Sequence, residues 1–87
     1  GLTVTLAAEF APSIRVNCIA PSLTSSKISQ SMLKSPVVSE ALAKSHPLKR
    51  LGEGKDSAAL AKFLLSENSS WVTGQIIGVD GGRSSLS

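Results

Sequence analysis

The sequence predicts an α/β fold in which helices cover both faces of a doubly wound parallel sheet. Residues 14–21 read Ile-Arg-Val-Asn-Cys-Ile-Ala-Pro, a short run rich in β-branched and apolar residues with a proline at each flank, which is typical of a strand. Apolar side chains fall on both of its faces, as in parallel sheets. A long, partly helical stretch separates it from a second strand-like run at 75–80, and parallel strands need such a connection.

Residues 1–13 are expected to be the end of a helix. Thr3, Leu6, Ala7 and Phe10 recur at the spacing of one helical face. Pro12 ends the helix, because the residue before a proline is pushed out of the α region. No capping residue precedes the pattern, so we expect the helix to start upstream of Gly1.

Residues 22–51 are predicted to form a loop and a flap. They are polar and serine-rich, with two short helices expected at about 27–34 and 37–44, broken at Pro36. Two interpretations stay open, a lid over a cleft and a plain surface excursion, with the lid favoured because long loop segments are often functional. His46 follows this stretch and could be an acid–base group or a ligand. A single histidine is more often a surface or loop residue, which is the expectation here.

Residues 52–70 are predicted to form the next helix. Its apolar stripe consists of Ala58, Ala61, Leu64 and Leu65. Glu53 and Asp56 place negative charge near its positive end. Those acidic groups oppose an anion, so we reject a phosphate cradle at the neighbouring glycines. Residues 71–87 are expected to hold the last strand, an Asp80-Gly81-Gly82 turn that tolerates positive φ, and a loose polar tail.

The predicted order is therefore helix, strand, helices, helix, strand, with a right-handed crossover between the strands. Two parallel strands cannot cover both edges of residues 14–21. We therefore expect the sheet to be completed by segments missing here or by another chain, so that residues 1–87 are incomplete on their own and do not fold stably alone.

Composition excludes several functional classes. The chain has 87 residues and a net charge of +3, and its nine basic residues are scattered, whereas a nucleic-acid footprint is clustered. Cys18 is the single cysteine, so a disulfide framework is excluded and no metal site is predicted. No apolar run has membrane-spanning length and no leader opens the chain, so we expect no membrane partner and a cytoplasmic setting.

Five stretches, in this order and spacing, strongly resemble the carboxyl-terminal portion of short-chain dehydrogenases/reductases. They are residues 6–12, 14–21, 47–52, 69–75 and 79–82, which read LAAEFAP, IRVNCIAP, PLKRLG, SSWVTGQ and VDGG. The similarity is greatest to 3-oxoacyl-carrier-protein reductases and glucose dehydrogenase-like members. It implies a Rossmann fold, an NAD or NADP cofactor, and hydride transfer between the nicotinamide and a small carbonyl or alcohol.

The resemblance also implies which residues meet the cofactor. The family's Pro-Gly-x-x-x-Thr loop corresponds to Pro21, Ser22, Thr24 and Ser26, with Thr24 at a backbone contact to the carboxamide and Ser26 where a threonine hydroxyl usually binds. Ser22 replaces the usual glycine. The substrate-side flap corresponds to residues 27–46. The candidates for its inner face, which would contact the substrate, are Leu23, Ile28 and Met32.

The family's acid–base tyrosine has no counterpart here, because the chain contains no tyrosine. By resemblance, the Tyr-x-x-x-Lys pair and the glycine-rich phosphate loop lie upstream of Gly1. We therefore assign no catalytic residue and predict that this chain alone is inactive. The last helix and strand resemble the family's subunit contact, which implies a homo-oligomer. The alternative is a non-catalytic association module that binds a related oligomer.

Overall fold

The structure is a computed structural model that describes residues 1–22, 32 and 34–86. The described elements follow the predicted order. In sequence they are α1 (Leu2–Phe10), β1 (Cys18–Pro21), α3 (Pro36–Lys44), α4 (Gly54–Leu64), the 3₁₀ helix η1 (Glu67–Ser69), β2 (Ile76–Val79) and α5 (Arg83–Leu86).

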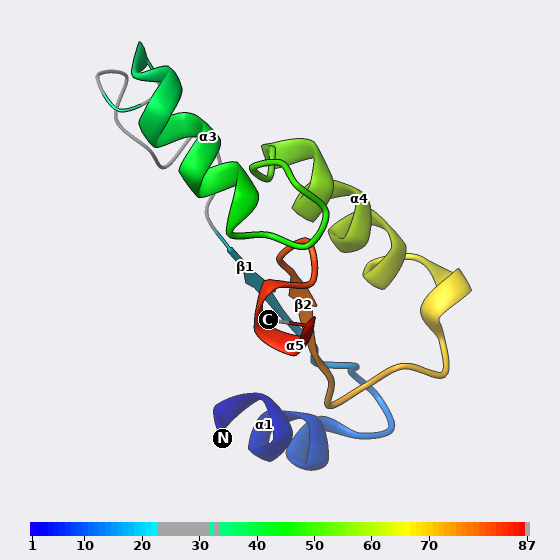
Figure 1. The fold of residues 1–87 in the computed structure, drawn as a ribbon. Helices are drawn as coiled ribbons and strands as arrows, with labels where there is room; N and C mark the ends of the chain where they lie inside the picture. The colour runs from blue at the N-terminus through cyan, green and yellow to red at the C-terminus, as the bar shows by residue number, and fades with distance from the viewer. Residues whose placement is uncertain (23–31, 33, 87) are drawn as a thin grey trace.

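The two described strands form a parallel sheet, which confirms the predicted α/β class (Figure 1). Cys18 lies opposite Ile76, and the register continues to Pro21 opposite Val79. Since β1 and β2 are parallel, their carboxyl ends lie at the same edge of the sheet. The polar residues that follow each strand therefore come together there.

The first strand is shorter than predicted, because its first half pairs through side chains. The Val16 N–H donates to Thr73 Oγ1 at 3.0 Å, and Asn17 Oδ1 accepts from the Gln75 N–H at 3.1 Å. These bonds replace part of the regular backbone ladder, and Gly74 turns here with a φ of 72°. Residues 14–17 are thus held beside the second strand but are not strand themselves.

Helix α1 ends as the sequence predicts. Ala11 has φ −66° and ψ 146°, an extended conformation that the following Pro12 favours. On its inner face Ala7 is 5% exposed and is the one buried apolar side chain among the described residues. Phe10, which shares the predicted face, remains 42% exposed.

Helix α3 confirms the second helix expected in the flap. Ser35 caps it, because the Ser35 side chain accepts a hydrogen bond from the Val38 N–H at 3.4 Å. Pro36 occupies the first turn, where its missing N–H is tolerated. The other expected helix, at about 27–34, lies outside the described residues except at Met32 and Lys34.

Helix α4 begins with acidic groups, as predicted, but ends earlier than residue 70. The Asp56 carboxylate accepts the Glu53 N–H at 2.7 Å and also binds the guanidinium of Arg50, at 2.9 and 3.0 Å. The helix stops at Leu64, and η1 follows. Leu65 was predicted to be in the apolar stripe, but it follows the last helical turn and is 87% exposed.

The C-terminal tail is not loose over residues 83–86, where it forms α5. The Asp80 carboxylate accepts hydrogen bonds from the Gly82 N–H at 2.9 Å, the Ser84 N–H at 3.3 Å and the Ser84 hydroxyl. These bonds satisfy amides at the start of the helix. Gly81 and Gly82 have φ values of 60° and 87°, so the expected positive-φ turn is confirmed.

One arginine ties the start of β1 to the end of α4. The Arg15 guanidinium donates to the Leu64 carbonyl and to the Ser69 hydroxyl, both at 3.0 Å. It also donates to the Ser66 and Val72 carbonyls at 3.3 Å. Carbonyls at a helix end have no partner within the helix, and a guanidinium can satisfy several of them at once.

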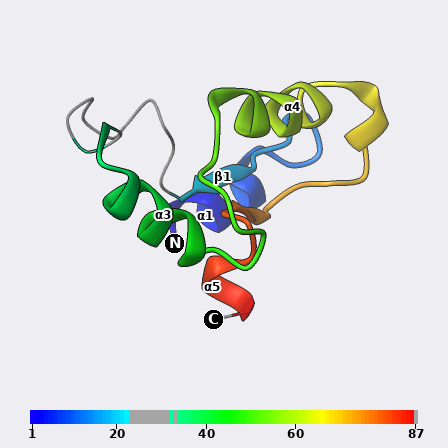
Figure 2. The same ribbon diagram turned by 45° about the horizontal axis from the view of Figure 1, so that its top comes forward.

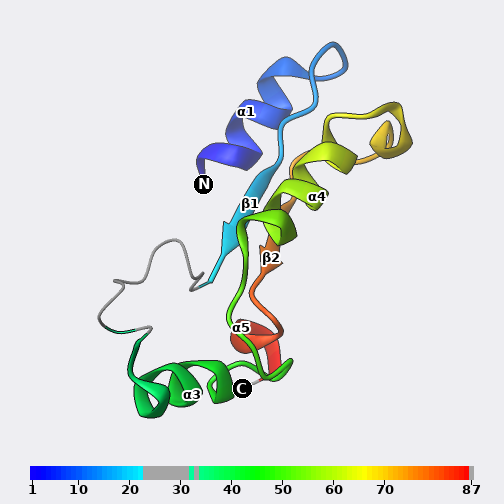
Figure 3. The ribbon, with the colours of Figure 1, turned by 90° about the horizontal axis from the view of Figure 1, so that it is seen from above.

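The described fold is elongated. Helix α4 runs alongside the two strands, whereas α3 projects from the end toward which the strands point (Figures 2 and 3). The Cα radius of gyration is 15.7 Å. A compact domain of this length would have about 12 Å. The described elements therefore pack along the sheet and do not enclose a large core.

In the complete protein, we expect Arg15→Lys to lower the free energy of unfolding by about 2 kcal/mol, since a lysine cannot reach the separate acceptors that the planar guanidinium binds. Urea unfolding followed by circular dichroism measures the change. Lys62→Ala, on the exposed side of α4, is the control and should stay within about 0.5 kcal/mol. Equal effects of the two substitutions would show that the Arg15 contacts do not stabilise the fold.

The start of α4 should make stability depend on pH. The hydrogen bond from Arg50 and then that from the Glu53 N–H lower the pKa of Asp56 from 3.8 to about 2. A lowered folded-state pKa stabilises the protein above pH 4, and this contribution is lost as the pH falls toward 2. In the complete protein, the melting temperature of Asp56→Asn should therefore lie below that of the unmodified protein at pH 7, and the difference should narrow between pH 4 and pH 3. A gap that stays constant, like that of the exposed control Glu9→Gln, would contradict this assignment.

Candidate functional site

The polar edge of the sheet is formed where both strands end. Ser22 follows β1, and its N–H donates to the Val79 carbonyl at 3.3 Å. Asp80 follows β2. In open α/β sheets, ligands bind outside the carboxyl ends of the strands. We call the edge formed by residues 21–22 and 78–82 the carboxyl edge.

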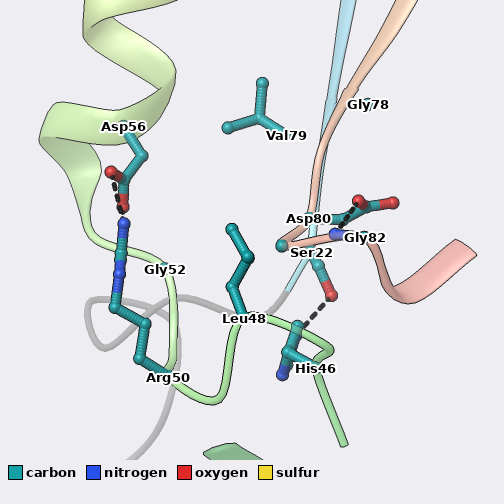
Figure 4. Close-up of a pocket in the computed structure, with 11 residues that line it drawn as sticks. Ser22, His46, Leu48, Arg50, Gly52, Asp56, Gly78, Val79, Asp80 and Gly82 are labelled. Carbon is teal, nitrogen blue, oxygen red and sulfur yellow. Dashed lines mark hydrogen bonds and ion pairs between the residues drawn. The ribbon is translucent and has the colours of Figure 1, made fainter. Parts of the chain in front are cut away.

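Two hollows open at the carboxyl edge. The first has a volume of about 390 Å³ and extends from Ser22 to the start of α4 (Figure 4). Its lining comprises Ser22, His46, Leu48, Arg50, Gly52, Asp56 and residues 78–82. The second, of about 380 Å³, is lined by residues 20–22, Asp80, Arg83 and Ser84. Ser22 and Asp80 belong to both.

His46 lies in the loop after α3, as one of the expectations had it, but it is buried at this edge and not on the surface. The side chain is 1% exposed. Its Nδ1 lies 2.9 Å from the Leu42 carbonyl in the last turn of α3, and its Nε2 lies 3.0 Å from the Ser22 hydroxyl. The imidazole thus bridges the end of α3 and the end of β1, a position that its place in the sequence did not reveal.

The partners of His46 fix its tautomer. A carbonyl oxygen can only accept, so Nδ1 carries a proton and donates to Leu42. In the neutral ring Nε2 is then an acceptor, and the Ser22 hydroxyl donates to it. The lone pairs of the Ser22 oxygen remain able to accept a further hydrogen bond.

Carboxylates shape the electrostatics of the edge. Hydrogen bonds from the Ser84 side chain and from the Gly82 and Ser84 amides lower the pKa of Asp80, so this group is ionised at neutral pH. Asp56, whose carboxylate is also ionised, lines the first hollow beside Arg50. The Arg50 guanidinium pairs with Asp56 at 2.9 Å and offsets its charge, so the first hollow combines groups of both signs and is compatible with an uncharged amide.

The predicted site residues are only partly placed by the structure. Pro21 is the last residue of β1, and Ser22 lines both hollows. Met32 is 44% exposed and is not among the described residues that line the hollows. The remaining candidates, Leu23, Thr24, Ser26 and Ile28, lie outside the described residues.

Sequence reasoning did not connect Ser22 with two other residues that line the first hollow, His46 and Asp80. His46 is 24 positions away, and no local pattern connects it with Ser22. Asp80 was read only as part of a turn, although its position directly after a parallel strand could have indicated the edge. Both residues reach the site through the fold.

Residues 1–22, 32 and 34–86 contain no group of three or more histidine, cysteine, aspartate or glutamate side chains placed to hold a metal ion. Over the same residues, no helix is long and apolar enough to cross a membrane.

The chain was compared with known proteins. Residues 1–84 match a family model described as enoyl-(acyl carrier protein) reductase. Dehydrogenase/reductase SDR family member 4 from Homo sapiens is 42% identical over 86 residues, which are 98% of this chain and 31% of that protein. The chain thus spans about a third of the length of this relative.

Solved structures share the fold. A short-chain type dehydrogenase/reductase from Mycobacterium ulcerans superposes with a TM-score of 0.82 at 42% identity, over 94% of this chain and 30% of the other. A gluconate 5-dehydrogenase from Burkholderia cenocepacia, solved with NADP and tartrate, gives 0.82 at 32% identity, over 97% and 33%. With a family model matched from residue 1 to residue 84, the chain belongs to the short-chain dehydrogenase/reductase family.

Proposed function

We propose that residues 1–87 are the carboxyl-terminal part of an NAD(P)-dependent oxidoreductase that interconverts a carbonyl and an alcohol by hydride transfer. The observation that carries this proposal is the match itself. It covers 98% of this chain but 31% of the human relative, which is a dehydrogenase/reductase. The rest of such an enzyme would supply what this segment lacks.

The incomplete character of the segment has physical support. Apolar side chains stay exposed on several elements, among them Ile14 at 54%, Leu65 at 87% and Ile76 at 60%. An isolated two-stranded sheet is marginal in water. Further strands beside β1 and β2 would cover this surface and complete a Rossmann-type sheet.

The carboxyl edge is where we place the cofactor. Pro21, Ser22, Thr24 and Ser26 would face the nicotinamide, and the substrate side would be formed by Leu23, Ile28 and Met32. The polar but carboxylate-lined surroundings of Ser22 suit the uncharged carboxamide better than the pyrophosphate. When bound, the cofactor supplies or accepts the hydride, while these residues bind and orient its nicotinamide end.

Proton transfer requires a residue from outside this segment. The chain has no tyrosine, and its single histidine is buried with both ring nitrogens in hydrogen bonds. General acid–base catalysis needs a group within hydrogen-bond reach of the substrate. We therefore place the acid–base pair upstream of Gly1.

A second candidate function rests on the exposed apolar surface of α4, the following loop and β2. Phe63 is 44%, Trp71 is 98% and Ile76 is 60% exposed. This surface supports homo-oligomerisation of the enzyme. It equally suits a non-catalytic association module that binds a related oligomer. An upstream reading frame that encodes Tyr-x-x-x-Lys favours the enzyme, whereas a start codon directly before Gly1 favours the module.

The complete reading frame should oxidise NADH or NADPH when a carbonyl substrate is present, whereas purified residues 1–87 should not. Loss of absorbance at 340 nm across a panel of small ketones and aldehydes measures both. The isolated chain should also show no cooperative thermal transition, because most of its apolar surface lacks a partner. Turnover by residues 1–87, or inactivity of the complete protein with both cofactors, would overturn the proposal.

Ser26→Ala in the complete protein should weaken NAD(P)H binding about fivefold, the effect of losing one hydrogen bond. Ser26→Thr keeps the hydroxyl and should bind normally. Fluorescence titration of the reduced cofactor gives both dissociation constants. Equal cofactor affinity of the two variants would show that the Ser26 hydroxyl does not bind the cofactor.

A further inference from the structure

His46 lies where three segments of the chain meet. Its ring contacts the last turn of α3 through the Leu42 carbonyl and the end of β1 through the Ser22 hydroxyl. The third segment is the turn after β2, where a Cβ added to Gly81 would lie 3.5 Å from the His46 Cβ. The residue thus has neighbours on three segments and is 1% exposed.

This arrangement determines the role of the Ser22 hydroxyl. The Ser22 backbone is held by its hydrogen bond to Val79, so the hydroxyl is the group that remains free to turn. His46 Nδ1 donates to Leu42, and Nε2 therefore accepts the Ser22 proton in the neutral ring. The hydroxyl presents its lone pairs, not its proton, to the carboxyl edge.

We infer that His46 is a positioning residue that makes Ser22 a hydrogen-bond acceptor for an N–H donor at the carboxyl edge, the nicotinamide carboxamide in the proposed function. The inference rests on that function and adds to it the role of His46 and the direction of the hydrogen bond made by Ser22. This hydrogen-bond direction agrees with the Asp80 carboxylate at the same edge, whose negative charge favours a hydrogen-bond donor over an anion. A glycine at position 22 would provide no such acceptor.

The test compares two cofactors that differ at one group. The 3-acetylpyridine analogue of NAD(P)⁺ replaces the carboxamide NH₂ with a methyl group, so it cannot donate. Ser22→Ala in the complete protein should weaken binding of NAD(P)⁺ about fivefold and leave binding of the analogue unchanged. Isothermal titration calorimetry measures both dissociation constants without turnover.

Variants of His46 separate its positioning role from packing. His46→Asn can keep the bond to Leu42 but cannot reach Ser22, so it should reproduce the selective loss seen in Ser22→Ala. Combining the two substitutions should weaken binding no further, because both remove the same interaction. His46→Gln has an amide oxygen near the position of Nε2 and should restore part of the affinity. Ser70→Ala, an exposed serine after η1, is the matched control and should change neither constant.

Nitrogen NMR of the His46 ring gives an independent reading. We expect the Nδ1-protonated tautomer at neutral pH in the unmodified protein. An Nε2-protonated ring, equal weakening of both cofactors by Ser22→Ala, or additive losses in the double variant would each overturn the inference. Failure of the unmodified protein to bind NAD(P)⁺ while the ring has the expected tautomer would instead reject the proposed function, and the cofactor role of the Ser22–His46 pair with it.

Discussion

The arrangement of the segment depends on the hydrogen bonds that the Arg15 guanidinium donates. β1 and α4 come from distant parts of the chain, and the helix end exposes carbonyls that need partners. Arg15 supplies donors to Leu64, Ser66, Ser69 and Val72 from a position just before the strand. This fixes the loop that leads into β2, and with it the parallel pairing of β1 and β2. Arg15 acts at the opposite end of the sheet from the carboxyl edge. The strand pairing that it helps to fix brings the residues of that edge together.

In the described residues, buried and hydrogen-bonded polar side chains take the place of a large apolar core. The two fully buried side chains among them are polar, His46 and Ser69, and both have hydrogen-bond partners. Buried polar groups that are fully paired specify one arrangement, because an unpaired alternative is unfavourable. His46 orders the end that faces the hollows, and Ser69 orders the end held by Arg15.

Membership of the short-chain dehydrogenase/reductase family gives the exposed surface a consistent explanation. Under the proposed function, further strands or a second subunit would cover exposed side chains such as Trp71 and Ile76. Twofold contacts of that kind bury the same patch on both partners. The segment thus combines one edge suited to chemistry with one surface suited to association.

Local patterns in the sequence determined the helices, the parallel strands and the turn at residues 80–82, since periodicity, Pro12 and Asp-Gly-Gly act within a few residues. That a ligand binds at the polar residues after β1 stays a prediction. Only the tertiary structure decided that residues 14–17 pair partly through side chains and that His46 meets Ser22. Those outcomes depend on partners such as Thr73, and on contacts that no spacing along the chain encodes.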